Sequence, residues 1–327
     1  MAGLVRNTID RVTPRSIIAL ASDMCVDLIL RGDVRPRFGQ AEQLLSDYQI
    51  EIGGSANIFA CQTAKLGLAT ALWGRVGADA FGTLLTERLG AAGVDISRVL
   101  VDRQLKTGLG VALSDGEDRG ILTYQGSINA LGPDDLPEHP AQVCQHWHVS
   151  SYYLLGRLRP AWPAFFARAR QEGVSLSLDP NWDPAERWDG VMDLLPFLNL
   201  IFVNEAELMA ISGADQLVAA ATELARKGPT VVVKRGVRGA MAVRGSDVTE
   251  LAPGLLRPVP DLVDSIGAGD NFAAGFLAAW LDRRSLNACL AHGHACAEAS
   301  LRAPGGIAGQ ITTSQALKDR VPDDQIA

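Results

Sequence analysis

Short apolar runs that alternate with helix-like segments constrain the fold of this 327-residue chain more than any other feature. Between these runs, segments such as AWPAFFARARQEG repeat apolar residues at helical spacing and end in glycine. Apolar strands separated by helices predict an α/β fold, in which a mostly parallel sheet carries helices on both faces. The runs read as buried strands that end in polar residues: SIIALAS at 16–22, SLSLDP at 175–180, LIFVN at 200–204 and TVVVK at 230–234.

Two segments, residues 28–52 and 99–126, lack the helical periodicity. The second carries SDGEDRG between alternating apolar runs, which is typical of a β-hairpin. We interpret both segments as a small separate sheet inserted near the start of the chain. No repeat, low-complexity tract or linker divides the sequence, so we expect one domain over residues 1–327 with this sheet as a lid.

Composition and charge argue against several classes of protein. The net charge of -7 and the absence of any Lys/Arg cluster argue against a nucleic-acid partner. The first residues lack the apolar core of a signal peptide, and no run approaches the ~20 apolar residues of a membrane-spanning helix. The five cysteines are scattered in apolar segments, as is typical of reduced core thiols. We therefore expect a cytoplasmic protein without a membrane partner.

The stretch DSIGAGDNFAAGF at 264–276 combines acids and glycines with a helix-like continuation. Gly267 and Gly269 allow backbone N–H groups to converge on an anion, and the following helix would aim its N-terminus at the same point. Asp270 would repel a bound phosphate unless it has a task, such as accepting a proton from a nucleophilic hydroxyl. The alternative is an ordinary helix start, where the helix dipole favours an acid.

Polar residues follow three other predicted strands. Asn204 and Glu207 fit a capping box, and Glu207 also offers the carboxylate oxygen that Mg²⁺ prefers. Gly236 and Gly239, in KRGVRGAM, predict either a tight turn or an exposed backbone along a nucleotide. DPNWDPAERW at 179–188 predicts a rigid turn, with a ligand role as the alternative.

Near the front of the chain, Asp27 and the segment GGSAN suit a small polyhydroxylated ligand. Asp27 and Asn57 can bond sugar hydroxyls, while Gly53 and Gly54 would let the backbone approach a ligand closely. The same residue types are typical of strand ends and helix caps. The phosphate motifs G-x-x-x-x-G-K-[ST] and, after the first strand, G-x-G-x-x-G are absent, which argues against P-loop and simple Rossmann proteins.

Taken together, these segments resemble the ribokinase-like (PfkB) family of sugar kinases over nearly the whole chain. DSIGAGD, the most specific match, fits the family signature D-T-x-G-A-G-D that precedes a helix. Further family-like segments occur in the family's order: GRVGADAFG (74–82), TGLGVALSDGEDRGILTYQGSINAL (107–131), LDPN, VNEAE and VVVKRGVRGA. The resemblance implies a three-layer, doubly wound, mostly parallel α/β domain with a small β-sheet lid.

The resemblance also implies an ATP-dependent transfer of phosphate to a hydroxyl. Asp270 would remove the proton from a substrate hydroxyl that attacks the γ-phosphate of ATP. Glu207 would serve Mg²⁺, and Asp264 lies in the segment near which K⁺ binds in this family. The residues implied for the phosphate anion hole are Gly267, Ala268 and Gly269, and those implied along the nucleotide are Asn204, Lys234, Gly236, Gly239 and His292.

On the substrate side, Asp27 matches an aspartate that binds sugar hydroxyls, and Gly53 and Gly54 match a G-G pair beside the sugar. The family's G-G-x-x-x-N is one residue shorter here, so an ungapped count places Ile58 at the asparagine position. Either the loop shifts so that Asn57 still reaches the sugar, or that contact is lost. G-G-K-G-A-N, the form typical of ribokinases, is absent, so ribose is not indicated.

The first hypothesis is a kinase that acts on a small sugar or sugar acid. A nucleoside kinase of the same family is the second. A non-catalytic ligand-binding protein on the same scaffold is the third, and the intact GAGD argues against it. Because the edges of lid sheets often pair in this family, we also expect a homodimer.

Overall fold

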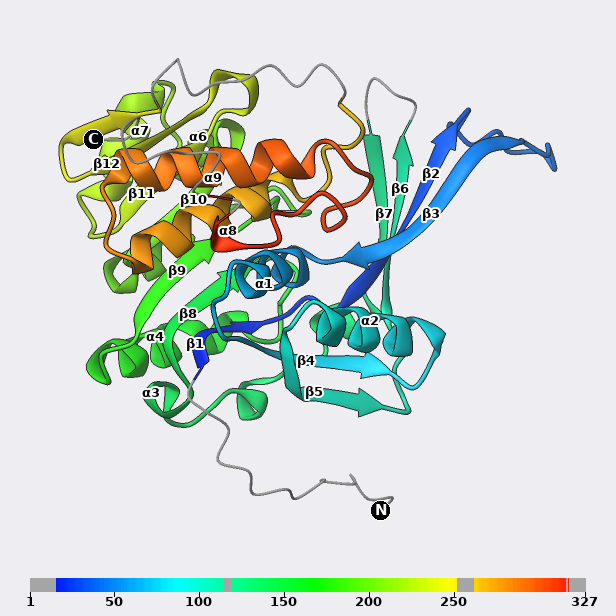
Figure 1. Cartoon of the computed structure of the whole chain (residues 1–327), viewed down its shortest axis with the longest axis horizontal. Coiled ribbons are helices and arrows are strands. Elements are labelled where there is room, and N and C mark those ends of the chain that lie inside the picture. Colours follow the sequence, from blue (N-terminus) through cyan, green and yellow to red (C-terminus); the bar gives the residue numbers. More distant parts are fainter. Residues whose placement is uncertain (1–15, 115–118, 252–261, 316, 318–327) are drawn as a thin grey trace.

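The structure is a computed structural model that describes residues 16–114, 119–251, 262–315 and 317. Within these residues the strands form two sheets (Figure 1). Every neighbouring pair of the larger sheet from β11 to β5 is parallel, whereas β11–β12 and β12–β13 are antiparallel. Its order is β13 (Asp247–Glu250), β12 (Ala240–Arg244), β11 (Thr230–Lys234), β10 (Leu200–Asn204), β9 (Ser175–Asp179), β8 (Cys144–Ser150), β1 (Ser16–Ala21), β4 (Thr70–Gly77) and β5 (Asp95–Asp102).

Continuous apolar sequence in these strands follows from burial of both faces of the sheet. In β10, Leu200 and Phe202 face one hydrophobic cluster, while Ile201 and Val203 face the other. Successive side chains of a strand point to opposite faces, so a strand between two helical layers needs apolar residues at nearly every position. The predicted mostly parallel sheet with helices on both faces is therefore confirmed.

Helices cover both faces of the large sheet. One layer consists of α1 (Ser55–Lys65), α2 (Ala80–Ala91), α8 (Ala268–Leu281) and α9 (Leu286–Ser300), and the other of α4 (Trp162–Gln171), α5 (Val191–Leu194), α6 (Glu205–Ser212) and α7 (Leu217–Ala225). A short α3 (Pro140–Val143) precedes β8. Short 3₁₀ turns lie at Gly126–Asn129, Pro133–Asp135, Arg159–Ala161, Leu195–Phe197 and Gly236–Arg238. Helix α8 is buried along most of its length, which explains its small and apolar sequence.

The smaller sheet has the order β3 (Leu45–Gly53), β2 (Cys25–Gly32), β6 (Gly108–Ser114) and β7 (Arg119–Tyr124) and projects beside the large one (Figure 1). Strands β6 and β7 pair as an antiparallel hairpin, and the tip at 115–118 lies outside the described residues. One expectation for this sheet was wrong: residues 99–102 belong to β5, which pairs in parallel with β4 in the large sheet. A lid function for the small sheet stays a prediction.

Two further sequence expectations concern the cysteines and the membrane. All five cysteines are buried, and none of them forms a disulfide bond in the described residues. Among the residues that the structure describes, no helix combines the length and the apolar character needed to cross a bilayer.

Candidate active site

Polar side chains gather where the parallel strands of the large sheet end. Strands β1, β8, β9, β10 and β11 present their carboxyl ends at one edge, because their pairing is parallel. The residues at or just after these ends are Ser22 and Asp23, Ser150 and Ser151, Asp179, Asn204, and Lys234. In open α/β sheets, ligands bind at this edge.

The turn before α8 has the geometry of an anion-binding site. Gly267 adopts a left-handed φ of 71°, and a Cβ there would lie 2.8 Å from Cα of Gly306. In the described part of the chain, no acceptor is bonded to the backbone N–H groups of Gly269 and Asp270. Asn271 holds the turn in place because its Nδ2 donates to the carbonyl oxygens of Gly267 (2.9 Å) and Gly306 (2.8 Å). The first turn of the helix is therefore open to an anionic ligand.

Asp270 lies inside this turn with only 7% of its surface exposed. Burial raises the pKa of Asp270 well above its usual value, and the nearby carboxylate of Asp179 raises it further. Lys234 and a hydrogen bond with the Ser55 side chain act in the opposite direction. A carboxylate with a raised pKa holds a proton more strongly, as a general base must.

Lys234 neutralises the acids that surround it. Its Nζ donates to Oδ2 of Asp179 at 2.6 Å, and it would lie 3.3 Å from a Cβ placed on Gly269. Burial alone would lower the pKa of Lys234, but the neighbouring carboxylates of Asp179 and Glu207 raise it above its usual value. Lys234 therefore keeps its positive charge beside the turn that precedes α8.

The other oxygen of Asp179, Oδ1, is buried and has no hydrogen-bond partner. Burial raises the pKa of the neighbouring Glu207, Lys234 lowers it and Asp179 raises it again. An orphaned carboxylate oxygen beside a second buried carboxylate fits the oxygen donors that Mg²⁺ prefers. These two residues could therefore hold the ion.

Asn204 and Glu207 also cap α6, as the sequence pattern predicts. The side chain of Asn204 accepts from the backbone N–H of Glu207 at 2.8 Å, and Glu207 Oε2 accepts from the N–H of Asn204 at 2.8 Å. This reciprocal pair fixes the direction of the Glu207 carboxylate at the end of β10.

Asp27 lies between two glycines of the small sheet. A Cβ on Gly53 would lie 2.3 Å from its Oδ1, and a Cβ on Gly110 would lie 2.4 Å from the same atom. The neighbouring strands β3 and β6 therefore need glycine at these positions to admit the carboxylate. Gly54 is also constrained, since it has a φ of 83° and a Cβ there would lie 2.5 Å from the carbonyl oxygen of Asp23.

The match of one family model decides the family of this chain. The model described as pfkB family carbohydrate kinase covers residues 16–313. The chain belongs to the PfkB family of carbohydrate kinases. It is a phosphotransferase that uses ATP to phosphorylate a sugar hydroxyl.

Curated relatives and solved structures agree with this PfkB assignment. An ATP-dependent ribose-1-phosphate kinase of Halopiger xanaduensis is 31% identical over 83% of this chain and 86% of the relative. A fructokinase of Klebsiella pneumoniae is 33% identical over 80% of this chain and 83% of the relative. A putative ribokinase II of E. coli, solved with ATP and Mg²⁺, matches the fold with a TM-score of 0.80 at 22% identity, over 94% of this chain and 99% of that one.

Asn57, expected at the sugar, is turned inward in this PfkB chain. The side chain is fully buried, where its Nδ2 donates to the carbonyl of Gly53 at 2.8 Å and its Oδ1 accepts from Ser22 at 2.6 Å. Ile58 is buried as well and packs against Gly267. The shortened GGSAN segment therefore braces the start of α1, and the described structure does not place its asparagine as a projecting sugar ligand.

Asp264, which the family resemblance links with K⁺, is contacted by donors of the protein itself. Its Oδ1 accepts from the N–H of Ile266 at 3.0 Å, and its Oδ2 accepts from the N–H of Gly305 at 3.0 Å. The guanidinium of Arg31, from the small sheet, lies 3.6 Å from the same Oδ2. Three donors therefore already surround this carboxylate, and a link of Asp264 with K⁺ stays a prediction.

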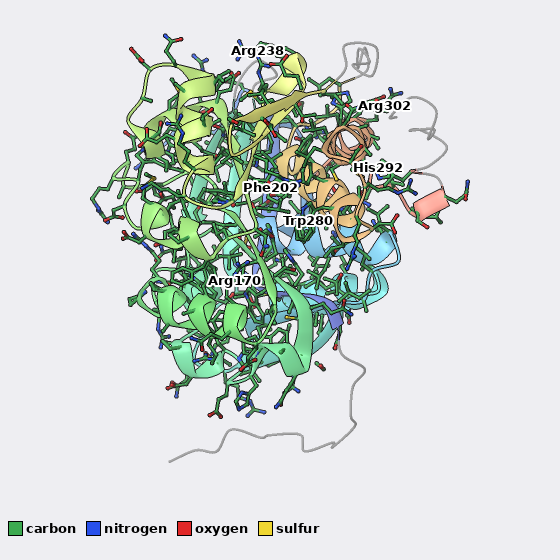
Figure 2. The ribbon with its side chains drawn as sticks, turned by 90° about the vertical axis from the view of Figure 1, so that its left-hand side faces the viewer. Arg170, Phe202, Arg238, Trp280, His292 and Arg302 are labelled. Carbon is green, nitrogen blue, oxygen red and sulfur yellow. The ribbon has the colours of Figure 1, made fainter. Side chains whose placement is uncertain are left out.

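The residues predicted to contact the nucleotide differ in their exposure. Gly236 and Gly239 form the tight loop after β11, both with positive φ, and a Cβ on Gly236 would meet open space. His292 lies buried in α9, and Figure 2 shows it well apart from Arg238 of that loop. The loop is thus open to a ligand, whereas the role of His292 stays a prediction.

Asp23 and Asp179, which are not among the predicted site residues, also lie at this site, and Asp179 begins the segment 179–188 for which a ligand role is the alternative. Asp23 is buried at the start of α1, where it accepts from the N–H groups of Ser55 (3.0 Å) and Ala56 (3.1 Å) and from Oγ of Ser151 (2.6 Å). Asp179 carries the orphaned oxygen beside Lys234. The available signal was their place at or near the carboxyl ends of buried strands, and only the pairing of those strands brings the two residues together.

Proposed function

We propose that this PfkB kinase phosphorylates a hydroxyl of a small sugar or sugar acid, with Asp270 as the general base. The observation that carries the proposal is the position of a buried carboxylate inside an anion-binding helix N-terminus. Asp270 would accept the hydroxyl proton as the oxygen bonds to the γ-phosphorus, while the bond to the β–γ bridging oxygen breaks and ADP leaves.

The surrounding residues would position the reactants. Asp27, framed by Gly53 and Gly110, would accept hydrogen bonds from sugar hydroxyls. The N–H groups of Gly269 and Asp270 would stabilise the charge that develops on the transferred phosphate. Lys234 would keep the acids around this charge partly neutralised.

Mg²⁺ would be held by Asp179 and Glu207, directly or through water. When bound, the ion supplies positive charge that offsets the charge of the phosphate oxygens. Support comes from the orphaned Oδ1 of Asp179 and the raised pKa of Glu207.

A homodimer through the small sheet is part of the proposal. Its support is a set of apolar side chains that are mostly exposed on that sheet: Tyr48 (65%), Ile121 (56%), Leu122 (62%) and Tyr124 (52%). Sedimentation of the wild type and of Leu122→Lys tests this, with Val237→Lys in a distant exposed loop as the control. A monomeric wild type would contradict it. A cytoplasmic location also stays a prediction.

The activity is tested with a panel of sugars, sugar acids and nucleosides in an assay of ADP formation, with K⁺ present and absent. We expect turnover with a sugar or sugar acid. Turnover confined to nucleosides would favour the nucleoside kinase hypothesis. Ligand binding without any ADP formation would favour a non-catalytic protein.

A further inference from the structure

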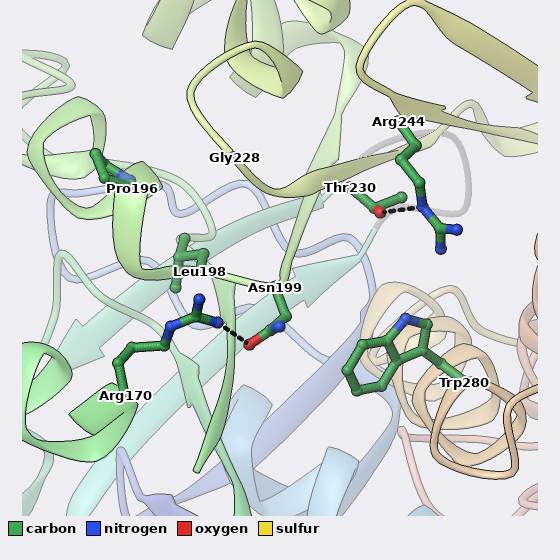
Figure 3. Close-up of a pocket in the computed structure, with 8 residues that line it drawn as sticks. All are labelled: Arg170, Pro196, Leu198, Asn199, Gly228, Thr230, Arg244 and Trp280. Carbon is green, nitrogen blue, oxygen red and sulfur yellow. Dashed lines mark hydrogen bonds between the residues drawn. The ribbon is translucent and has the colours of Figure 1, made fainter. Parts of the chain in front are cut away.

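A pocket shown in Figure 3 lies at the start of β11, whereas Lys234 of the proposed active site lies at the other end of the same strand. It has a volume of about 270 Å³. Thr230 begins β11 at this pocket and Lys234 ends the same strand at the active site, so the two sites are about 13 Å apart along the strand. The lining residues are Arg170, Pro196, Leu198, Asn199, Gly228, Thr230, Arg244 and Trp280.

Neutral groups anchor the two arginines of the pocket. Arg170 Nη1 donates to Oδ1 of Asn199 at 3.1 Å, and Arg244 Nε donates to Oγ1 of Thr230 at 3.2 Å (Figure 3). Each guanidinium therefore keeps further N–H donors for a ligand. The carboxamide of Asn199 and the hydroxyl of Thr230 add polar groups between them.

The pocket carries positive charge in the part of the chain that the structure describes. In the described residues neither Arg170 nor Arg244 forms an ion pair, unlike Arg75, Arg159 and Arg235. None of the eight lining residues is acidic. Two anchored guanidinium groups without a carboxylate, in a chain of net charge -7, are suited to an anionic ligand.

The size and the walls of the pocket favour a small ligand with both an apolar and an anionic part. Its volume of about 270 Å³ lies just below the ~300 Å³ at which drug-sized sites begin, which suits a small ligand. Leu198, Pro196 and the indole of Trp280 provide apolar walls for a short carbon skeleton. Donors on both sides match the several oxygens of a phosphate monoester.

Helix α8 links this pocket to Asp270. Trp280 lies in its last turn and Asp270 in its first, about 15 Å apart along one buried helix. A series of side-chain contacts also begins at the indole of Trp280, whose ring centroid lies 5.9 Å from that of His146. His146 contacts Ser177 at 2.7 Å, and Ser177 contacts His148 at 2.6 Å.

We propose that this pocket binds a small phosphate-bearing metabolite and that its occupancy alters the catalytic end of α8. The test uses ribose 5-phosphate and inorganic phosphate as probes, with calorimetric titration of protein saturated with Mg²⁺ and a non-hydrolysable ATP analogue. Ribose and malonate serve as the uncharged and the carboxylate probes. Asp27→Asn distinguishes this pocket from the sugar end of the active site.

We expect wild type and Asp27→Asn to bind a phosphate-bearing probe equally well. Arg170→Gln and Arg244→Gln should weaken binding at least tenfold, which is about 1.4 kcal/mol. Arg98→Gln, an exposed arginine of β5, is the matched control and should bind like wild type. Thermal unfolding of each variant shows whether the fold is kept.

Kinetics provide the second readout. Without probe, Arg244→Gln should turn over like wild type. The bound probe should change kcat or KM at least twofold in wild type and in Arg98→Gln, but not in Arg244→Gln. No binding of either phosphate-bearing probe, or binding that both arginine variants retain, would overturn the proposed site. Equal affinity for malonate would overturn the phosphate assignment, and binding without a kinetic change would overturn the link to α8.

Discussion

Lys234 donates a hydrogen bond of 2.6 Å to one oxygen of Asp179, whose other oxygen is buried without a partner. The pair joins the ends of β9 and β11, which are separated in the sheet by β10. It places one positive charge among the carboxylates of Asp179, Glu207 and Asp270.

Lys234→Met should destabilise the protein by about 3–5 kcal/mol, because it leaves buried carboxylates without their counter-charge. The double variant Lys234→Met with Asp179→Asn should recover part of that loss. Urea unfolding measures both. As a control, loss of the exposed pair in Arg284→Met should cost less than about 1 kcal/mol. Equal losses at both sites would contradict a buried pair.

Asp270→Asn should lower kcat by roughly 10²–10⁴-fold, since it removes the general base. In wild type, kcat/KM should fall as the pH drops through the raised pKa of Asp270. Steady-state kinetics between pH 5 and 9 measure both effects. Asp282→Asn, in the exposed residue that ends the same helix, is the matched control. Normal turnover of Asp270→Asn would refute the mechanism.

The same substitution should raise the melting temperature at pH 8. The folded-state pKa of Asp270 lies above its unfolded value of 3.8, so the folded protein binds more protons between the two values. Stability therefore falls as pH rises through this window, and the neutral asparagine avoids that loss. Thermal unfolding at pH 5 and pH 8 measures the effect, and an unchanged melting temperature at pH 8 would argue against a buried, raised carboxyl.

Gly53→Ala should raise KM for the sugar about tenfold or more while KM for ATP changes little. The added Cβ would lie 2.3 Å from Oδ1 of Asp27 and displace the carboxylate. Gly120→Ala, with open space around the added Cβ, is the control and should behave like wild type. An equal rise in both KM values would place Asp27 outside the sugar site.

Glu207→Gln should raise the Mg²⁺ concentration for half-maximal activity about tenfold. The carbonyl of glutamine can still accept the N–H of Asn204, so the α6 cap and the melting temperature should be kept. Glu205→Gln, in the same helical turn, is the control. Unchanged Mg²⁺ dependence would restrict Glu207 to the cap.

Much of the fold could be predicted because its signals are local. Apolar runs at 16–22 and 200–204 require burial on both faces, whatever their neighbours are. The left-handed φ of Gly267 likewise follows from a glycine placed before a helix. Residues 99–102 show the limit of such signals, since an edge strand of the large sheet and a strand of the small one have the same alternation.

The α/β class, a turn suited to an anion and Asp270 as the candidate base could be predicted from the amino-acid sequence, because periodicity and glycine placement act within a few residues. The folded chain was needed to show that Asp23 and Asp179 lie near Asp270, that Asn57 turns inward, and that two arginines line one pocket. These outcomes depend on which strand ends lie side by side and on where buried side chains find partners. Both the neighbours of a strand end and the partners of a buried side chain depend on contacts between residues far apart in the chain.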